Sequence, residues 1–195
     1  MKPAKSIHLA LCSLPVILAG CVIGSSALPP ALTASQARRL GELPLPYSVG
    51  VARYQYPVYS EALAKALISA RVFRRVAPIG SFTHPPDLIA TVEEAIHGTA
   101  TIPVAFLLTA GLVPSGTEEN HGYVFSLAPS SQRNRKTRVD ARYSGTTTLG
   151  STALAFAALP SYSLGDPERT RRFREMLAHR TLVALRPSPS SRTNR

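Results

Sequence analysis

The sequence predicts an α/β fold: a single small domain with a mixed sheet, one or two packed helices and a β-hairpin in the C-terminal half of the chain. The first observation is that the spacing of apolar residues switches between periods of two and about 3.6 residues in the first half. The second is a long alternation of polar and apolar residues further on. The third is composition: 195 residues with 45% hydrophobic content, 17 prolines and 12 glycines suit one compact core joined by many turns.

The first half of the chain alternates between strand and helix patterns. Val49 and Val51 share one side of a run whose other side is small or polar, which predicts a strand. Leu63 and Leu67 recur at helical spacing after Ser60, a residue type that caps helix N-termini. The expected elements are a strand over 47–54, a helix over 59–73, and strands over 73–78 and 87–96.

The second half predicts a hairpin followed by a helix. Val139 and Ala141 alternate with Asp140 and Arg142, which is typical of an antiparallel strand with one dry and one wet face. A helix is expected to begin after Asp166, a good N-cap residue. The expected elements are hairpin strands over 121–128 and 137–148 and a helix over 165–180.

The first 21 residues have the pattern of a secretory signal. Lys2 and Lys5 precede the apolar run 7–18, which is too short to span a bilayer as a helix. The tetrapeptide Leu18-Ala19-Gly20-Cys21 is similar to the lipobox of bacterial lipoproteins, which implies cleavage before Cys21 and attachment of acyl chains such as palmitate. Two or more acyl chains would anchor the protein firmly to a membrane. The alternatives are a plain secretory signal, or an uncleaved anchor, that contains a cysteine.

The lipobox interpretation sets the expected domain organisation. It comprises a signal peptide (1–20), a lipidated cysteine with a tether (21–46), an α/β domain (47–186) and a basic disordered tail (187–195). By analogy with sorting in bacteria that have two membranes, Val22 in place of an aspartate favours the outer membrane, with the domain facing the periplasm. Cys12 lies in the signal, so no internal disulfide is expected.

The charge of the chain favours anionic partners. Formal net charge is +11, and removal of the two lysines of the signal leaves about +9. Arg133, Arg135, Lys136 and Arg138 gather at the tip of the expected hairpin, where each would add about 1 kcal/mol of attraction to an anionic surface. The alternatives are a solvated loop and a contact with anionic lipid or another envelope polymer. Nucleic acid is not an expected partner, because the expected location is outside the cytoplasm and no aromatic residues are interleaved with the basic ones.

Two apolar stretches, 102–114 and 149–160, flank the expected hairpin. Their lengths suit a core helix, a buried strand or a segment at a membrane interface. Burial in the core is one interpretation. The other is that both stretches contact the membrane or a partner.

Motifs for catalysis or metal binding are missing from the sequence. It contains no HExxH, GxSxG or P-loop pattern. Glu93 and Glu94 adjoin on an expected strand, so their side chains should face opposite ways and form no catalytic pair. We therefore expect a non-enzymatic protein without cofactor or metal, which binds a protein or an envelope polymer. The first alternative is a component of a secretion or envelope-assembly complex whose apolar segments contact the membrane. A third hypothesis is an envelope hydrolase.

The order of these patterns resembles a group of small envelope lipoproteins. A lipobox precedes the strand "VGVA", a helix ending in "VF", a strand that opens at Asp87, the stretch "LLTAGLVPSG", and then a hairpin and a helix. Over roughly residues 45–185 this resembles the curli-assembly lipoprotein and the penicillin-binding-protein activator lipoproteins. The resemblance implies a compact α/β domain in the cell envelope, and it implies no particular site residues.

Overall fold

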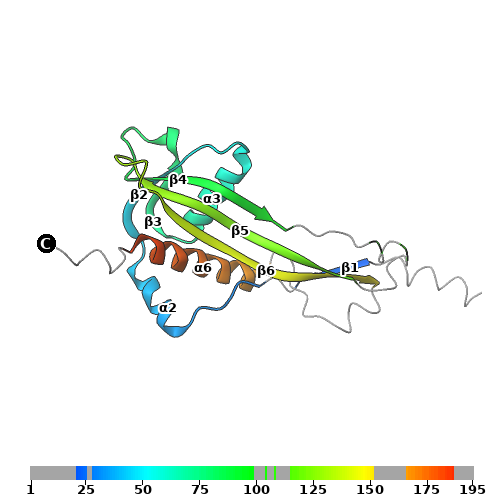
Figure 1. The fold of residues 1–195 in the computed structure, drawn as a ribbon. Helices are drawn as coiled ribbons and strands as arrows, with labels where there is room; N and C mark the ends of the chain where they lie inside the picture. Colours follow the sequence, from blue (N-terminus) through cyan, green and yellow to red (C-terminus); the bar gives the residue numbers. More distant parts are fainter. Residues whose placement is uncertain are drawn as a thin grey trace, which may run out of the picture. The chain divides into compact units, whose positions relative to one another are not determined.

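The computed structural model describes residues 21–25, 28–98, 104, 108, 115–151 and 166–186. It confirms the α/β class, with a mixed sheet, packed helices and a hairpin in the C-terminal half (Figure 1). The elements are β1 (Cys21–Ser25), α2 (Ala34–Arg39), η1 (Leu40–Glu42), β2 (Leu45–Val51), α3 (Pro57–Ser69), β3 (Phe73–Pro78), η2 (Ile79–Ser81), β4 (Leu88–His97), β5 (Ser115–Pro129), β6 (Thr137–Ser151) and α6 (Pro167–Leu185). The strands follow the order β1-β6-β5-β4-β2-β3.

The chain divides into two compact units. Among the described residues, unit 1 contains β1, the start of β5 and the end of β6, and unit 2 contains the other elements with residues 121–143 of the hairpin. In unit 1, β1 is antiparallel to β6, with Cys21 opposite Ser151 and Ser25 opposite Thr147. The backbone of the expected lipidation residue is therefore part of a sheet.

Residues 29–46, expected as part of a tether, belong to unit 2. Thr33 and Gln36 form a capping box at the start of α2, in which each side chain accepts a hydrogen bond from the other residue's backbone N–H, over 3.3 and 2.9 Å. Leu40 and Leu43 lie against the hydrophobic core. The apolar residues that follow α2 explain why this stretch folds back instead of extending.

Strand β2 lies between two parallel neighbours, β3 and β4. Helix α3 makes the crossover from β2 to β3, as parallel pairing requires. It begins at Pro57, three residues before the expected N-cap Ser60, because proline suits the first position of a helix. Ser60 is instead inside the helix, where its hydroxyl donates to the carbonyl of Pro57 over 2.8 Å.

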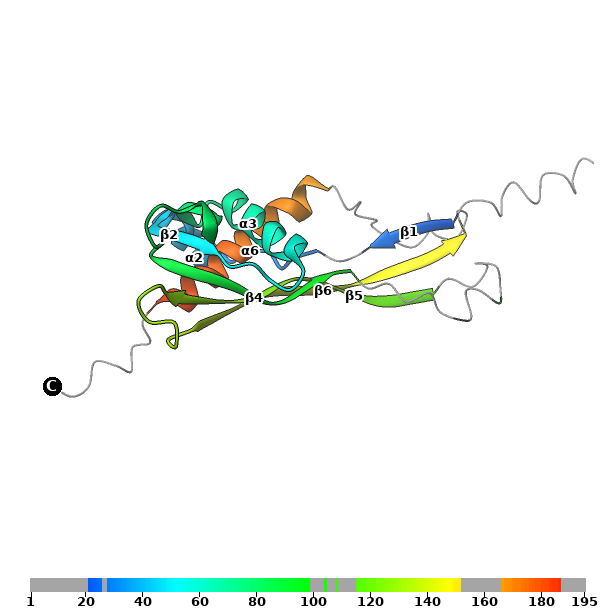
Figure 2. The same ribbon diagram turned by 90° about the horizontal axis from the view of Figure 1, so that it is seen from above.

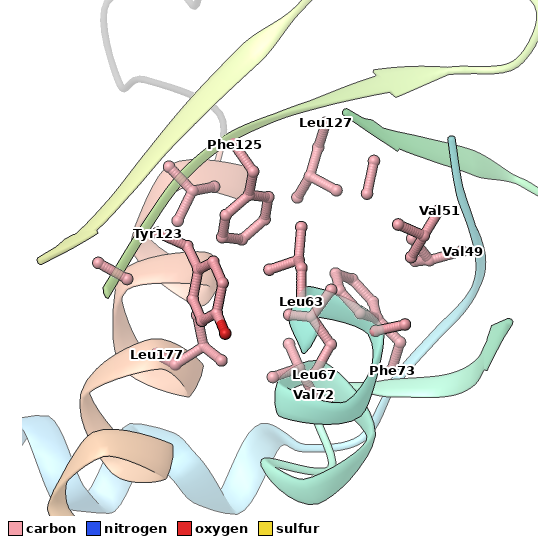
Figure 3. Close-up of a cluster of buried hydrophobic side chains, with 14 of the residues drawn as sticks. Val49, Val51, Leu63, Leu67, Val72, Phe73, Tyr123, Phe125, Leu127 and Leu177 are labelled. Atoms are coloured by element: carbon pink, nitrogen blue, oxygen red, sulfur yellow. The ribbon is translucent and has the colours of Figure 1, made fainter. Parts of the chain in front are cut away.

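The core of unit 2 lies between one face of the sheet and the helices α3 and α6, which both cover that face (Figure 2). In Figure 3, Tyr123, Phe125 and Leu127 of β5 point towards Leu63 of α3 and Leu177 of α6. Each of these side chains is buried, and burying one apolar side chain of this size contributes about 1.5–3 kcal/mol. We call this the inner face of the sheet, and its opposite the outer face.

Strands β5 and β6 form the expected hairpin, and β5 is antiparallel to β4. Val139 and Ala141 are buried on the inner face, as the alternation predicts. Gly122 has a φ of +124°, and a Cβ atom there would lie 2.1 Å from the carbonyl oxygen of Ala141 on the adjacent strand. The close approach of β5 and β6 at this point therefore requires glycine.

The segment 79–87 leads from the end of β3 to the start of β4 and passes over β2 at Gly50. A Cβ atom on Gly50 would lie 2.7 Å from Cγ of Pro86 and 3.3 Å from Cγ1 of Ile79. Because Val49 on the same strand points into the core, this crossover segment covers the outer face of β2. Beside it, β3 ends the strand order with exposed arginines at 74 and 75.

Candidate functional site

The loop between β5 and β6 carries three of the four basic residues singled out from the sequence. Arg133, Arg135 and Lys136 are all exposed. No ion pair involves them within the described ranges. Three positive charges are thus available to an external anion at this end of the hairpin.

Arg138, the fourth residue, is on β6 and has a partner within the chain. Its Nε lies 3.3 Å from a carboxylate oxygen of Glu93 on β4. Its side chain is 64% exposed, so the pair is weak in water and leaves the guanidinium accessible. Arg138 therefore borders the loop cluster with part of its charge compensated.

The outer face of the hairpin has a second ion-pair group centred on Arg142. This guanidinium donates to both carboxylate oxygens of Asp140, over 3.0 and 2.7 Å, and to Glu94 over 3.2 Å. The hydrogen bonds from Arg142 lower the pKa of Asp140. Because β5 lies between β6 and β4, these side chains reach across β5, where Val124 is fully buried. The carboxylates of Asp140 and Glu94 are therefore already paired with a guanidinium of this chain.

Glu93 and Glu94 do not face opposite ways, contrary to the expectation from strand alternation. The β4–β5 register shifts between Val92 and Glu94, as a β-bulge requires. The two carboxylates instead accept from Arg138 and Arg142, both on the outer face of β6. Each glutamate is part of a charge pair that stabilises the hairpin.

The base of the basic loop is held by hydrogen bonds to the crossover segment. The hydroxyl of Ser130 donates to the carbonyl of Pro86, and its backbone N–H donates to the carbonyl of Asp87 over 3.1 Å. Asp87 in turn accepts from the backbone N–H and the hydroxyl of Ser48 on β2, over 2.7 and 2.6 Å. These bonds lower the pKa of Asp87. The loop is therefore anchored, through the crossover segment, to β2, the strand beside the edge strand β3.

A cavity of about 380 Å³ lies between the loop and the crossover segment. Phe82, His84, Ser130 and Arg133 are among its lining residues, and no carboxylate lines it. The guanidinium of Arg75 lies over the ring of Phe82, 4.7 Å from its centre, which is a cation–π geometry. We call Arg75, Arg133, Arg135 and Lys136 the basic end.

Sequence reasoning placed three of the four basic-end residues together and missed Arg75. Its membership depends on the crossover segment, which brings Phe82 under the guanidinium. The available signal was the period of two along 73–78: Val76 packs against the core, so its neighbour Arg75 must face outwards. Nothing in the local pattern indicated that the loop at 130–136 and the segment 79–87 meet.

A polar cluster that the sequence did not reveal lies within unit 2 on α6. Arg169 is 5% exposed, and it donates to the hydroxyl of Tyr143 over 3.1 Å and contacts Nε2 of His121 at 2.8 Å. Guanidinium cannot accept a hydrogen bond, so Nε2 accepts and the proton of the neutral imidazole is on Nδ1. The rings of His121 and Tyr143 are stacked, with centres 5.4 Å apart. The phenol of Tyr123 is nearby in the same core, and burial, with Tyr143 as a smaller cause, raises its pKa to about 12.

Several expectations fall on residues outside the described ranges. The side chain of Cys21 is not described, nor are most residues of the apolar stretches 102–114 and 149–160. Two residues of the first stretch are described, and both are exposed: Val104 at 68% and Leu108 at 82%.

In the described part of the chain, no group of three or more His, Cys, Asp or Glu side chains is placed to hold a metal ion. Likewise, none of the described helices combines the length and apolar character needed to cross a bilayer. In the comparisons with known proteins, no family model and no curated protein matches the chain.

Proposed function

We propose that this chain is a non-enzymatic lipoprotein of the bacterial envelope, acylated on Cys21 and anchored in the outer membrane with its folded part in the periplasm. Its function is to bind an anionic envelope polymer, or a protein with an acidic surface, through the basic end. The anchor is supported by the signal pattern and the lipobox-like tetrapeptide ending at Cys21. The proposal includes the resemblance to curli-assembly and penicillin-binding-protein activator lipoproteins, as a relation of fold and location.

The observation that carries the binding function is the exposure of three basic side chains that are unpaired within the described ranges, those of Arg133, Arg135 and Lys136. They are exposed, have no ion pair among the described residues, and extend from a loop whose base is hydrogen-bonded to the crossover segment. A fixed base reduces the ordering cost of binding. With about 1 kcal/mol for each basic group near an anionic surface, the three contribute about 3 kcal/mol, or roughly 100-fold in affinity.

The anchor is tested by the intact mass of the protein extracted from its native membranes. We expect a chain that begins at Cys21 and carries the added mass of two or three acyl groups. A chain that retains residues 1–20, or an unmodified thiol, would refute the anchor and leave the binding proposal to its own test.

Binding is tested with the triple variant Arg133→Gln, Arg135→Gln and Lys136→Gln. The comparison uses chains that carry no acyl group. Their affinity for anionic vesicles, measured by co-sedimentation at low and high salt, should fall by roughly 100-fold at low salt. A matched control removes three exposed charges elsewhere, by Arg38→Gln, Lys65→Gln and Arg174→Gln. Equal losses in the two variants would mean that overall charge, rather than the basic end, attracts the anion.

A second function is favoured by the exposure of Val104 and Leu108. Exposed apolar residues in an apolar stretch suit contact with a membrane or a partner, as in a component of a secretion or envelope-assembly complex. Here 102–114 and 149–160 would be the contact segments. If vesicles protect 102–114 from protease and the segment is cleaved when lipid is absent, the result would support this function. Cleavage at equal rates with and without vesicles would refute it.

A further inference from the structure

A second cavity, of about 430 Å³, opens where the parallel strands β2 and β3 end. Val51 from the end of β2 and Pro78 from the end of β3 line it, together with Ala64 of α3. Open parallel sheets bind their ligands beyond the carboxyl ends of the strands. The volume is within the range of about 300–1,000 Å³ that is typical of small-molecule sites.

The cavity has an apolar floor and two charged residues of opposite sign. Val51 and Ala64 are buried and supply the floor, with Ile79 as one wall. Arg53 and Glu61 also line the cavity, and both are exposed. Neither has an ion pair within the part of the chain that the structure describes. The site thus offers one cation and one anion beside apolar surface.

The backbone of β2 at Gly50 lies directly against Ile79 and restricts the position of this wall. Gly50 lies against Ile79 so closely that an added Cβ would be 3.4 Å from its Cα. Prolines at positions 57 and 78 restrict the backbone on two other sides. A cavity with fixed walls loses little entropy when it takes up a ligand.

We propose that this cavity binds a small zwitterion with an apolar body, either a free apolar amino acid or a short apolar peptide. The guanidinium of Arg53 would donate to the carboxylate, and the carboxylate of Glu61 would accept from the ammonium group. The apolar side chain would lie on Val51 and Ala64. Helix α3 has no side-chain cap and no acidic residue in its first turn, so its positive end also favours the carboxylate. This site is independent of the proposed anchoring and of the basic end.

Leucine and leucyl-leucine are the probes, with binding to the full chain measured by calorimetry. N-acetyl-leucine lacks the ammonium group and leucinamide lacks the carboxylate. Each should bind at least about tenfold more weakly than leucine, because a charge-assisted hydrogen bond is lost. Tighter binding of leucine would indicate that the ligand is a free amino acid, and tighter binding of leucyl-leucine would indicate a short peptide.

The two charged residues can be assigned by variants. In Arg53→Gln the penalty for leucinamide should vanish while that for N-acetyl-leucine remains, and Glu61→Gln should give the reverse. Selectivity that is unchanged in both variants would overturn the assigned roles.

Substitutions at Gly80 and Gly41 provide a matched test, in which a large side chain is added at the cavity or away from it. A Cβ atom at either glycine would meet no atom within 4 Å, and only Gly80 lines the cavity. We expect Gly80→Leu to abolish binding of both probes and Gly41→Leu to leave it unchanged. Failure of both probes to bind the unmodified chain, or full binding by a folded Gly80→Leu variant, would overturn the proposal, whatever the outcome at the basic end.

Discussion

Ser48 and Asp87 are joined by three hydrogen bonds that run in both directions. The hydroxyl and the backbone N–H of Ser48 donate to one carboxylate oxygen of Asp87, and the backbone N–H of Asp87 donates back to the hydroxyl over 3.0 Å. The pair connects β2 to the residue just before β4 and, through Ser130, to the basic loop. It adds a side-chain link between the parallel part of the sheet and the hairpin, beside the pairing of β4 with β5.

This link predicts a loss of stability in acid. The pKa of Asp87 is lowered by Ser48 from its usual 3.8, so the folded state favours the carboxylate. The stabilisation is present above about pH 4 and is lost as pH falls through the lowered folded-state pKa. The urea midpoint of Asp87→Asn should therefore lie below that of the unmodified chain at about pH 6 and approach it at about pH 2.

Ser48→Ala is the control for this prediction. It removes both side-chain bonds, so Asp87→Asn in that background should add a much smaller change to the midpoint. An additive double variant would mean that the two residues stabilise the fold separately.

Replacing Gly50 should strain the crossover segment. In Gly50→Ala the new methyl would lie 2.7 Å from the ring of Pro86, which is buried and cannot rotate away. Overpacking of this kind costs about 1–3 kcal/mol in the free energy of unfolding. Gly41→Ala, where the methyl meets open space, should change it by a much smaller amount. Equal denaturation midpoints for the two variants would show that the crossover segment shifts to make room for the methyl group without a loss of stability.

His179 predicts a second, milder pH dependence. It is 8% exposed on α6, its Nε2 has no hydrogen-bond partner among the described residues, and burial together with Arg39, Arg180 and Arg186 lowers its pKa from 6.5. The unfolded chain therefore binds the proton more readily, so stability is full above about pH 7 and falls as pH drops below 6.5. His179→Leu should flatten this part of the stability profile, measured by urea unfolding. If the slope of stability against pH is unchanged in this variant, the pH dependence must arise from other titratable groups.

Arg169 should stabilise unit 2 through its two aromatic partners. Arg169→Met keeps much of the side-chain volume and leaves Tyr143 and His121 without this donor, which costs about 1–3 kcal/mol. Nitrogen NMR should report a neutral His121 protonated on Nδ1 in the unmodified chain. Finding the proton on Nε2 would contradict the donation from Arg169.

The elements that were predicted well are those whose signal is local. The period of two placed β2, β4 and the inner residues of the hairpin, and helical spacing placed α3 and α6 to within a few residues. The start of α3 differs from the expectation because two helix-start signals compete: Ser60 suits an N-cap, whereas Pro57 suits the first helical position, at which the helix begins. The stretch before β2 has no local pattern that distinguishes it from a tether, because its few apolar residues are recognised only by their packing against the core.

The features that could not be predicted depend on residues far apart in the sequence. Ser48 and Asp87 are 39 positions apart, and nothing near either indicates the other. The bulge that turns Glu93 and Glu94 to one face is set by pairing with β5 and by the arginines of β6. The basic loop was located from its own residues, whereas the cavity beside it required the crossover segment.

The arginines and the terminal proline of β3 restrict how this protein can meet others. Side-by-side addition of a foreign strand at β3 would bring charged groups into a backbone ladder and, at Pro78, would lack a donor. Growth of the sheet into an aggregate is thereby hindered on this side. Recognition at this side must then use side chains, whose charge and shape can select one partner over another.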